Sequence, residues 1–164
     1  MLGPNHEHFK SEARKGRAFG EAYIAARLTF EGLPAKLEPL ELAETPWEKH
    51  RFRGQRDVRV KGFQIEVKSS SYEFTTDITK WPFGEAFVID LNRWDTMKEK
   101  PLAVVFVSQV NHATLFVWAQ PELWWVKRIY DTREERQRSK LEICARKADL
   151  KQWSELVKAL KEAA

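Results

Sequence analysis

Cysteine is almost absent from this chain of 164 residues, in which Cys144 is the only one. A single cysteine excludes an internal disulfide and any zinc site built on several thiolates, and it suits a reducing compartment such as the cytoplasm. Long apolar runs are also missing, since none approaches the ~20 residues that a membrane-spanning helix needs. The N-terminal segment MLGPNHEHFK lacks the apolar core of a signal peptide, so we expect neither export nor a membrane partner.

Several other signals are missing as well. The chain has no glycine-rich phosphate loop, no nucleophile motif, no internal repeat and no low-complexity linker. What it does contain is 43% hydrophobic and 12% aromatic residues. This composition, at this length, predicts a single folded domain over residues 1–164.

Neither sign of charge is in large excess, because the formal net charge is only +4. The basic residues are nevertheless unevenly distributed. Residues 127–151 carry nine lysines and arginines against five acidic residues, and His50–Lys61 carries five against Asp57 alone. Segregated positive charge is typical of a surface that follows a phosphate backbone, although solvated surface is the simpler interpretation of any one cluster.

The segment before residue 31 predicts a helix from Ser11 to about Phe30, ended by a glycine and a proline. Its expected apolar stripe consists of Ala18, Phe19, Ala22, Tyr23, Ala26 and Phe30. Glu21 lies on another face, with Ala25 and Leu28, so we expect it at an edge of the core. The crowded positive charges at the helix start oppose the helix dipole, which indicates a role toward a ligand such as a phosphate chain.

The remaining pattern is that of an α/β fold in one domain. Continuous apolar runs predict central strands, covered on both faces, at Ala86–Asp90, Leu102–Val107 and Thr114–Trp118. Shorter strands are expected within LPAKLEPLEL and at Lys140–Cys144. Asp149 is expected to cap a final helix with one apolar face.

The stretch RDVRVKGFQIEVKSSS, residues 56–71, predicts two strands joined by a two-residue turn at Lys61 and Gly62, because glycine supplies the positive φ that such a turn requires. In this register Asp57 lies opposite Glu66. Alternation of side chains then predicts two faces. The buried face comprises Val58, Val60, Phe63, Ile65 and Val67, and the other comprises Asp57, Arg59, Gln64, Glu66 and Lys68.

Two opposed carboxylates predict a metal site on this second face. Directly opposed side chains have Cβ atoms only ~4.5–5.5 Å apart, so Asp57 and Glu66 repel each other unless a cation lies between them. Mg²⁺ takes oxygen ligands, commonly one or two carboxylates with a substrate phosphate. Lys68 shares the face, where its ammonium can orient the attacking water and offset charge on the phosphate. Glu21 would add an outer carboxylate if its helix packs beside the hairpin.

Other interpretations stay open for several of these residues. An exposed amphipathic hairpin with a Glu–Lys pair would show the same pattern. Ser69 and Ser70 either donate hydrogen bonds to phosphate or end the strand, and His112 has no evident partner in the sequence. The core is expected to hold Trp118 and Trp153. A role in stacking on unpaired bases stays open for Trp81, Trp94, Trp124 and Trp125.

These residues resemble the PD-(D/E)XK nuclease superfamily, the group with the restriction-endonuclease-like fold. The match consists of a helix that carries Glu21, a strand that starts at Asp57 and the strand with Glu66, Val67 and Lys68. Within the superfamily, RKGRAFGE before GQRDVRV and IEVKSS is similar to archaeal Holliday-junction resolvases and their phage or bacterial relatives. The resemblance covers roughly Lys15–Trp118.

The resemblance implies a mixed central sheet flanked by helices. It also implies Mg²⁺ or Mn²⁺ bound by Asp57, Glu66 and the carbonyl of Val67, with Lys68 as the catalytic lysine. The nuclease core would span about residues 11–118, with residues 127–164 as a C-terminal extension. The chain departs from the motif at Arg56, where the motif has proline, and its insertion at residues 31–56 and its extension exceed a compact resolvase.

We therefore expect a cytoplasmic, Mg²⁺-dependent endonuclease that hydrolyses phosphodiester bonds of double-stranded or branched DNA, with Asp57, Glu66, Lys68 and Glu21 as catalytic residues. A homodimer, a catalytically silent DNA-binding module of the same fold and an RNA-processing nuclease stay open. Contacts with the nucleic acid are expected from Arg14, Lys15, Arg17, Arg51, Arg53, Arg59, Lys61, Ser69 and Ser70.

Overall fold

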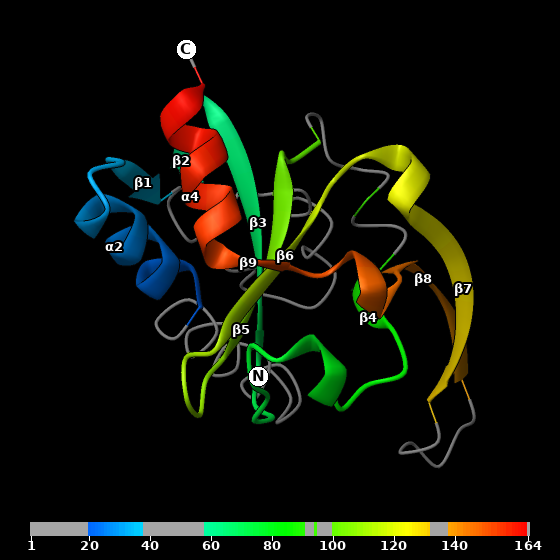
Figure 1. Ribbon diagram of the computed structural model, residues 1–164. Helices are drawn as coiled ribbons and strands as arrows, with labels where there is room; N and C mark the ends of the chain where they lie inside the picture. The colour runs from blue at the N-terminus through cyan, green and yellow to red at the C-terminus, as the bar shows by residue number, and fades with distance from the viewer. Residues whose placement is uncertain (1–19, 38–57, 91–93, 95–99, 132–137, 164) are drawn as a thin grey trace, which may run out of the picture.

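The computed structural model describes residues 20–37, 58–90, 94, 100–131 and 138–163 (Figure 1). These residues form a mixed α/β domain with two α-helices, and its main sheet has six strands. The elements are helix α2 (Ala22–Phe30), strands β1 (Ala35–Leu37), β2 (Val58–Val60), β3 (Phe63–Ser70), β4 (Ala86–Asp90), β5 (Ala103–Ser108), β6 (Thr114–Trp118), β7 (Trp124–Asp131), β8 (Arg138–Ala145) and β9 (Lys151–Gln152), and helix α4 (Trp153–Glu162). Single 3₁₀ turns occur at Ile78–Lys80, Pro121–Leu123 and Lys147–Asp149.

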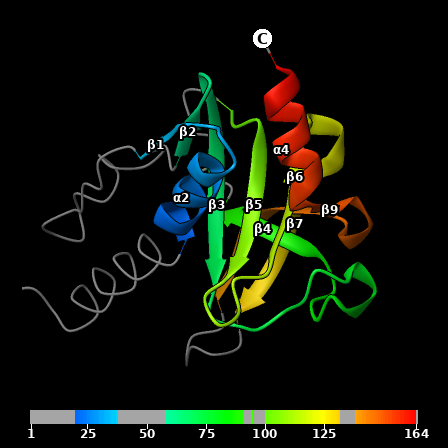
Figure 2. The ribbon, with the colours of Figure 1, turned by 60° about the vertical axis from the view of Figure 1, so that its left-hand side comes forward.

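The elements are arranged in three layers. The six-stranded sheet has the order β1-β2-β3-β5-β6-β9, and a smaller sheet has the order β4-β8-β7. Both helices lie against one face of the large sheet, while the small sheet lies on its other side (Figures 1 and 2). The large sheet is mixed because β3 pairs with β2 antiparallel and with β5 parallel.

The predicted hairpin of residues 56–71 is confirmed over its described part. β2 and β3 pair with Val58 opposite Ile65 and Val60 opposite Phe63, as the two-residue turn requires. The turn residues Lys61 and Gly62 have φ angles of 50° and 81°. Positive φ at both positions is the geometry that matches the twist of two antiparallel strands.

Side-chain alternation divides the core into two parts. Ile65 and Val67 of β3 point into a core shared with α2 and α4, together with Val105 of β5. The neighbouring residues Val104 and Phe106 point the other way, into a core shared with the small sheet. Because β5 is covered on both faces, all six of its residues are buried, as its continuous apolar run predicts.

Helix α2 ends as predicted, at a glycine in the left-handed region. Gly32 has a φ of 84°, and the N–H of Leu33 donates to the carbonyl of Leu28 at 2.9 Å. This is the pattern of a Schellman motif, and Leu33 is buried beside it. The predicted start of the helix at Ser11 lies outside the described residues.

Over residues 22–30 the predicted apolar stripe of α2 is confirmed at Tyr23, which is half-buried against the core, but is wrong at Ala26 and Phe30. The buried residues are Ile24, Ala25 and Leu28, whereas Ala26 is exposed and Phe30 is 93% exposed. The helix has apolar residues on more than one face, so its own pattern does not select the face that packs on the sheet. The face that is buried is the one that carries Ala25 and Leu28, to which the sequence pattern assigns Glu21.

The predicted position of β4 as a central strand is also wrong. Among the described strands β4 lies at the edge of the small sheet, where it pairs with β8 alone and has a bulge between Phe87 and Ile89. The other predicted central strands, β5 and β6, are confirmed. β7 was not predicted, and it pairs with β8 along eight residues from Trp124 to Asp131.

The final helix begins later than predicted. Asp149 accepts a hydrogen bond from Arg146 in a 3₁₀ turn, and Gln152 is the N-cap residue of α4. The chain cannot be helical before Trp153 because Lys151 and Gln152 pair with β6. The predicted apolar face is confirmed, since four residues of the helix are buried: Trp153, Leu156, Val157 and Leu160.

None of the helices in the described ranges is both long enough and apolar enough to cross a membrane.

Candidate functional site on strand β3

Strand β3 carries Glu66 and Lys68, two of the predicted catalytic residues. Glu66 is buried, with 3% of its surface exposed, and Lys68 is exposed. Because side chains alternate, both lie on the face of β3 opposite to Ile65 and Val67, which pack against the helices. A carboxylate and an ammonium therefore lie two residues apart on one side of a central strand.

The backbone of β3 directs the carbonyl of Val67 toward the side on which β2 runs. The carbonyl of Gln64 accepts a hydrogen bond from Leu102 at 2.8 Å, and that of Ser70 accepts one from Gln109 at 2.8 Å, both from the β5 side. Backbone groups alternate between the two neighbours of a strand, and the pairing with β5 is continuous over these residues. The carbonyl of Val67, an odd-numbered residue, therefore points away from β5.

Asp57 lies outside the described residues, so its pairing with Glu66 stays a prediction. The described pairing of β2 with β3 begins at the next residue, with Val58 opposite Ile65. Five of the residues expected to contact DNA also lie outside the described ranges: Arg14, Lys15, Arg17, Arg51 and Arg53.

Gln64 is a second buried polar residue on the same face as Glu66. Its side chain is 3% exposed, and within the described part of the chain neither Nε2 nor Oε1 has a hydrogen-bond partner. A buried polar group in this condition costs about 1–3 kcal/mol and is usually met by an ordered water or an ion. The polar character of this face therefore extends from Glu66 to Gln64.

Glu21 approaches the end of β3 rather than the face that carries Glu66. It is half-buried, and like Gly20 it has π-helical backbone directly before α2. A Cβ placed on its neighbour Gly20 would be only 3.1 Å from Cβ of Ser69, so the helix start is in close contact with the strand. Since α2 covers the opposite face, Glu21 can reach the side of Glu66 and Lys68 only around the end of β3.

The serines that follow Lys68 anchor the end of the strand. Oγ of Ser69 accepts a hydrogen bond from Nε2 of Gln109 at 3.0 Å, and Oγ of Ser70 accepts one from the backbone N–H of Tyr72 at 3.1 Å. These bonds support the structural role that was left open for both serines. Their hydroxyl groups can still donate while they accept.

His112, for which the sequence shows no evident partner, has one in the fold. It occupies the β5–β6 turn with a φ of 60°, and its ring stacks on Tyr23 of α2 with centroids 4.6 Å apart. Tyr23 and His112 are far apart in the sequence, so no local pattern predicts this contact. It ties the turn to the helix at the same end of β3.

Two described basic residues of the hairpin, Arg59 and Lys61, were expected to contact DNA, and both have contacts within the protein. Nη1 of Arg59 donates to the carbonyl of Gly62 at 3.1 Å. Nζ of Lys61 donates to the carbonyl of Ala163 at 2.9 Å, at the C-terminus of α4. Their predicted contacts with a nucleic acid stay predictions.

Most of the tryptophans considered for stacking are buried. Trp81, Trp94 and Trp124 have 8%, 9% and 9% of their surface exposed, and Nε1 of Trp124 donates to the carbonyl of Trp118. Trp153 is buried as expected. Trp125 on β7 is half-buried, and its stacking role stays a prediction.

An aromatic pocket lies beside Lys68, and Trp81 is the only one of its rings that the sequence pattern had indicated for stacking. It has a volume of about 210 Å³ and is lined by Lys68, the three serines after it, Tyr72, Phe74, Trp81, Phe83 and Phe106. The signal in the sequence is the aromatic density of SYEFTTDITKWPF directly after the predicted catalytic lysine.

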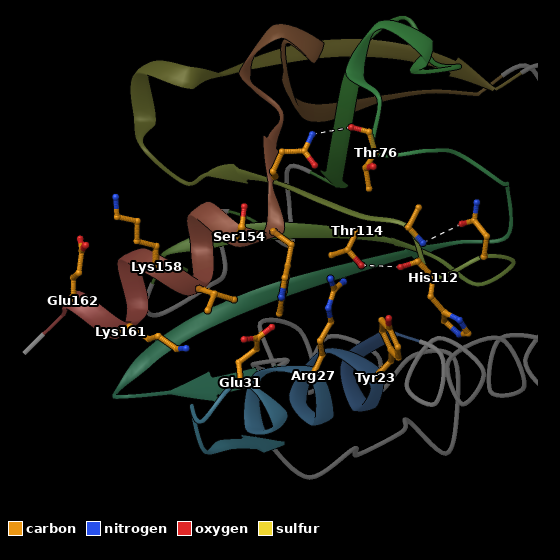
Figure 3. Close-up of a pocket in the computed structure, with 15 residues that line it drawn as sticks. Tyr23, Arg27, Glu31, Thr76, His112, Thr114, Ser154, Lys158, Lys161 and Glu162 are labelled. Carbon is orange, nitrogen blue, oxygen red and sulfur yellow. Dashed lines mark hydrogen bonds between the residues drawn. The ribbon is translucent and has the colours of Figure 1, made fainter.

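A larger cavity, of about 940 Å³, lies between α2 and α4 (Figure 3). Lysine, arginine and glutamate side chains are mixed along it, and Arg27 lies over the ring of Trp153 at 4.6 Å. The residues that line it include none of Glu21, Glu66 and Lys68. The predicted chemistry therefore belongs to the β3 site, not to this cavity.

The donor set on β3 fits a hard divalent cation in part. Glu66 offers a carboxylate, and the carbonyl of Val67 points to the β2 side; both are oxygen donors of the kind that Mg²⁺ prefers. Among the described residues no group of three or more His, Cys, Asp or Glu side chains could hold a metal ion. A complete site on β3 would therefore need a further ligand from outside them, and Asp57 is the predicted one.

Comparison of the chain with protein-family models, with curated proteins and with solved structures gives no significant match.

Proposed function

We propose that this protein is a metal-dependent endonuclease that hydrolyses phosphodiester bonds of DNA. The observation that carries the proposal is the pair on β3, a buried carboxylate at Glu66 and an exposed lysine at Lys68, on one face of a central strand. Burial of a carboxylate costs free energy, and a bound cation offsets that cost. The mixed central sheet is also the kind of sheet that the PD-(D/E)XK resemblance implies.

Asp57, Glu66 and the carbonyl of Val67 would hold Mg²⁺ or Mn²⁺. When bound, such a metal neutralises charge on the phosphate and lowers the pKa of a coordinated water. Glu66 is well suited to hold it because the surrounding strand is rigid. β3 is paired on both sides, and apolar side chains on its other face fix its position.

Lys68 would orient the attacking water and stabilise negative charge that develops on the phosphate. Its position two residues after Glu66 keeps both side chains on the same face of the strand, and its exposure lets a phosphate reach it. Glu21, from the helix on the other side, would act from the end of the strand. We therefore expect its removal to cost less activity than removal of Glu66.

The test is a cleavage assay with a matched pair of controls. The wild type is incubated with linear, supercoiled, single-stranded and four-way-junction DNA, in Mg²⁺ and in EDTA. The site variants are Asp57→Asn, Glu66→Gln and Lys68→Met. The controls are Glu85→Gln and Lys127→Met, which break an exposed Glu–Lys pair at 2.9 Å outside the site.

We expect cleavage in Mg²⁺ only, a loss of at least about 100-fold in each site variant, and near wild-type rates in both controls. Absence of cleavage on every substrate would contradict the proposal, as would site variants that cut as fast as the controls. DNA binding that is salt-dependent, indifferent to EDTA and without cleavage would instead support a DNA-binding module. Cleavage of the ribonucleotide versions alone would indicate an RNA-processing nuclease.

A further inference from the structure

The pocket beside Lys68 differs in character from the polar face that it adjoins. Its walls are aromatic rings, and its polar groups lie at one edge, where β3 ends in Lys68 and the serines. The pocket thus presents an apolar interior of about 210 Å³ next to the cation that the proposed function assigns to phosphate. A ligand that fills it should be flat and apolar on its faces and carry a negative charge at one edge.

The rings are held in fixed orientations by contacts with one another. Trp81 packs edge-to-face on Phe74, Phe83 and Phe106, with centroids 4.9, 5.2 and 6.0 Å apart. Tyr72 packs edge-to-face on Phe83 at 5.9 Å. Edge-to-face packing fixes ring planes, so the pocket is formed before a ligand arrives.

The pocket has a buried floor and an accessible rim. Phe74, Trp81 and Phe106 are 3%, 8% and 6% exposed, and they belong to the core between the two sheets. Tyr72 is 59% exposed, and its backbone is held in place because Oγ of Ser108 donates to its carbonyl at 2.9 Å. An exposed aromatic ring on an anchored backbone is a suitable partner for stacking.

We propose that this pocket receives one unstacked base of the nucleic acid whose phosphate lies at Lys68. The inference rests on the proposed function, which supplies the phosphate. Every base has an aromatic face that can stack on Tyr or Phe. A nucleotide carries its base and its phosphate in one molecule, so one nucleotide can reach both the aromatic rings and the adjoining lysine. A base inside an intact duplex cannot enter, so the pocket selects strands with unpaired or easily extruded bases, such as single strands and branch points.

The test compares normal and abasic DNA in EDTA, where no cleavage occurs. Affinities are measured by fluorescence anisotropy for a single-stranded oligonucleotide and for an abasic strand of the same length, which keeps every phosphate and removes the bases. The variants are Tyr72→Ala and Phe83→Leu. The control is Phe30→Ala, which removes an aromatic ring that is 93% exposed outside the pocket. Circular dichroism melting checks that each variant is folded.

We expect the wild type and Phe30→Ala to bind the normal strand about five- to 150-fold more tightly than the abasic one, and Tyr72→Ala to lose most of this ratio. The affinity for the abasic strand should be the same in all variants, because the phosphate contacts remain. Equal affinity of the wild type for both strands would overturn the proposal, as would an unchanged ratio in both Tyr72→Ala and Phe83→Leu.

The outcome is independent of the cleavage assay. If the wild type cuts DNA but binds the normal and abasic strands equally, the proposed base pocket is contradicted and the proposed nuclease activity is not. If the wild type cuts no substrate but binds the normal strand more tightly in a way that depends on Tyr72, the proposed nuclease activity is contradicted and the pocket for an unstacked base is supported.

Discussion

At the residue scale, one face of β3 carries three polar side chains that differ in burial: Gln64, Glu66 and Lys68. Gln64 and Glu66 are each 3% exposed, while Lys68 is open to solvent. Alternation along the strand predicts that the three share a face, because the side-chain period of a strand is two. It does not predict which of them is covered, because coverage depends on segments far away in the sequence.

Cys144 provides a test at the same scale. The thiol is buried, and burial, followed by the nearby carboxylates of Glu85 and Glu142, raises its pKa to about 11 from an ordinary value of 9.0. Between these two values the unfolded chain loses its thiol proton before the folded chain does. This group therefore makes stability fall as the pH rises from about 9 to about 11 and has no effect below that range.

We expect the wild type to lose more stability than Cys144→Ala over this range. Urea unfolding of both proteins at pH 7, 9 and 10.5 measures the difference, and other groups that titrate there cancel in the comparison. A parallel pH dependence in the two proteins would show that the thiol ionises equally easily in the folded and unfolded states.

At the element scale, α2 shows how packing overrides a pattern. Its sequence offers apolar residues around much of the helix, including Tyr23, Ala26 and Phe30. The sheet selects Ile24, Ala25 and Leu28, which reach into the core beside β3. Propensity and caps could therefore be predicted for this helix, whereas its buried face could not, because the choice depends on the shape of the surface it meets.

The β2–β3 turn and α4 are joined by one side chain, which allows an element-scale prediction. Nζ of Lys61 donates to the carbonyl of Ala163, and a cation at a helix C-terminus interacts favourably with the helix dipole. We expect Lys61→Met to lower the free energy of unfolding by about 0.3–1 kcal/mol, less at high salt.

The matched control is Lys158→Met, which removes a lysine from the exposed side of the same helix. Urea unfolding at low and high salt measures both variants. Equal stabilities of the two variants would show that the contact of Lys61 with the helix end contributes nothing. If Lys61→Met binds DNA more weakly than the wild type and Lys158→Met does not, the result would support the predicted contact of Lys61 with phosphate.

At the scale of the whole molecule, the segment predicted as a C-terminal extension completes both cores. α4 supplies Trp153, Leu156 and Leu160 to the core on one face of the large sheet. β8 supplies Ile143 and Ala145 to the core on the other face. β4 lies between β3 and β5 in the chain, and its pairing partner in the part of the chain that the structure describes is β8.

A chain truncated after Trp118 should therefore not fold. It would expose both faces of the large sheet and leave β4 without its partner strand, and the apolar surface so exposed contributes roughly 25 cal/mol per Å² to stability. Far-UV circular dichroism with thermal melting measures this, with the full-length chain as reference. A cooperative melt of the truncated chain would show that residues 1–118 are a self-sufficient core.

The sequence by itself determined the local features of this protein. These are the Lys61–Gly62 turn and its register, the glycine end of α2, the continuous apolar strands β5 and β6, and the shared face of Glu66 and Lys68. Each follows from short-range backbone geometry or from side-chain alternation, which act within a few residues. Only the tertiary structure decided which face of α2 is buried, where β4 lies and that aromatic rings gather beside Lys68. Those depend on contacts between distant segments, whose free energies no local pattern contains.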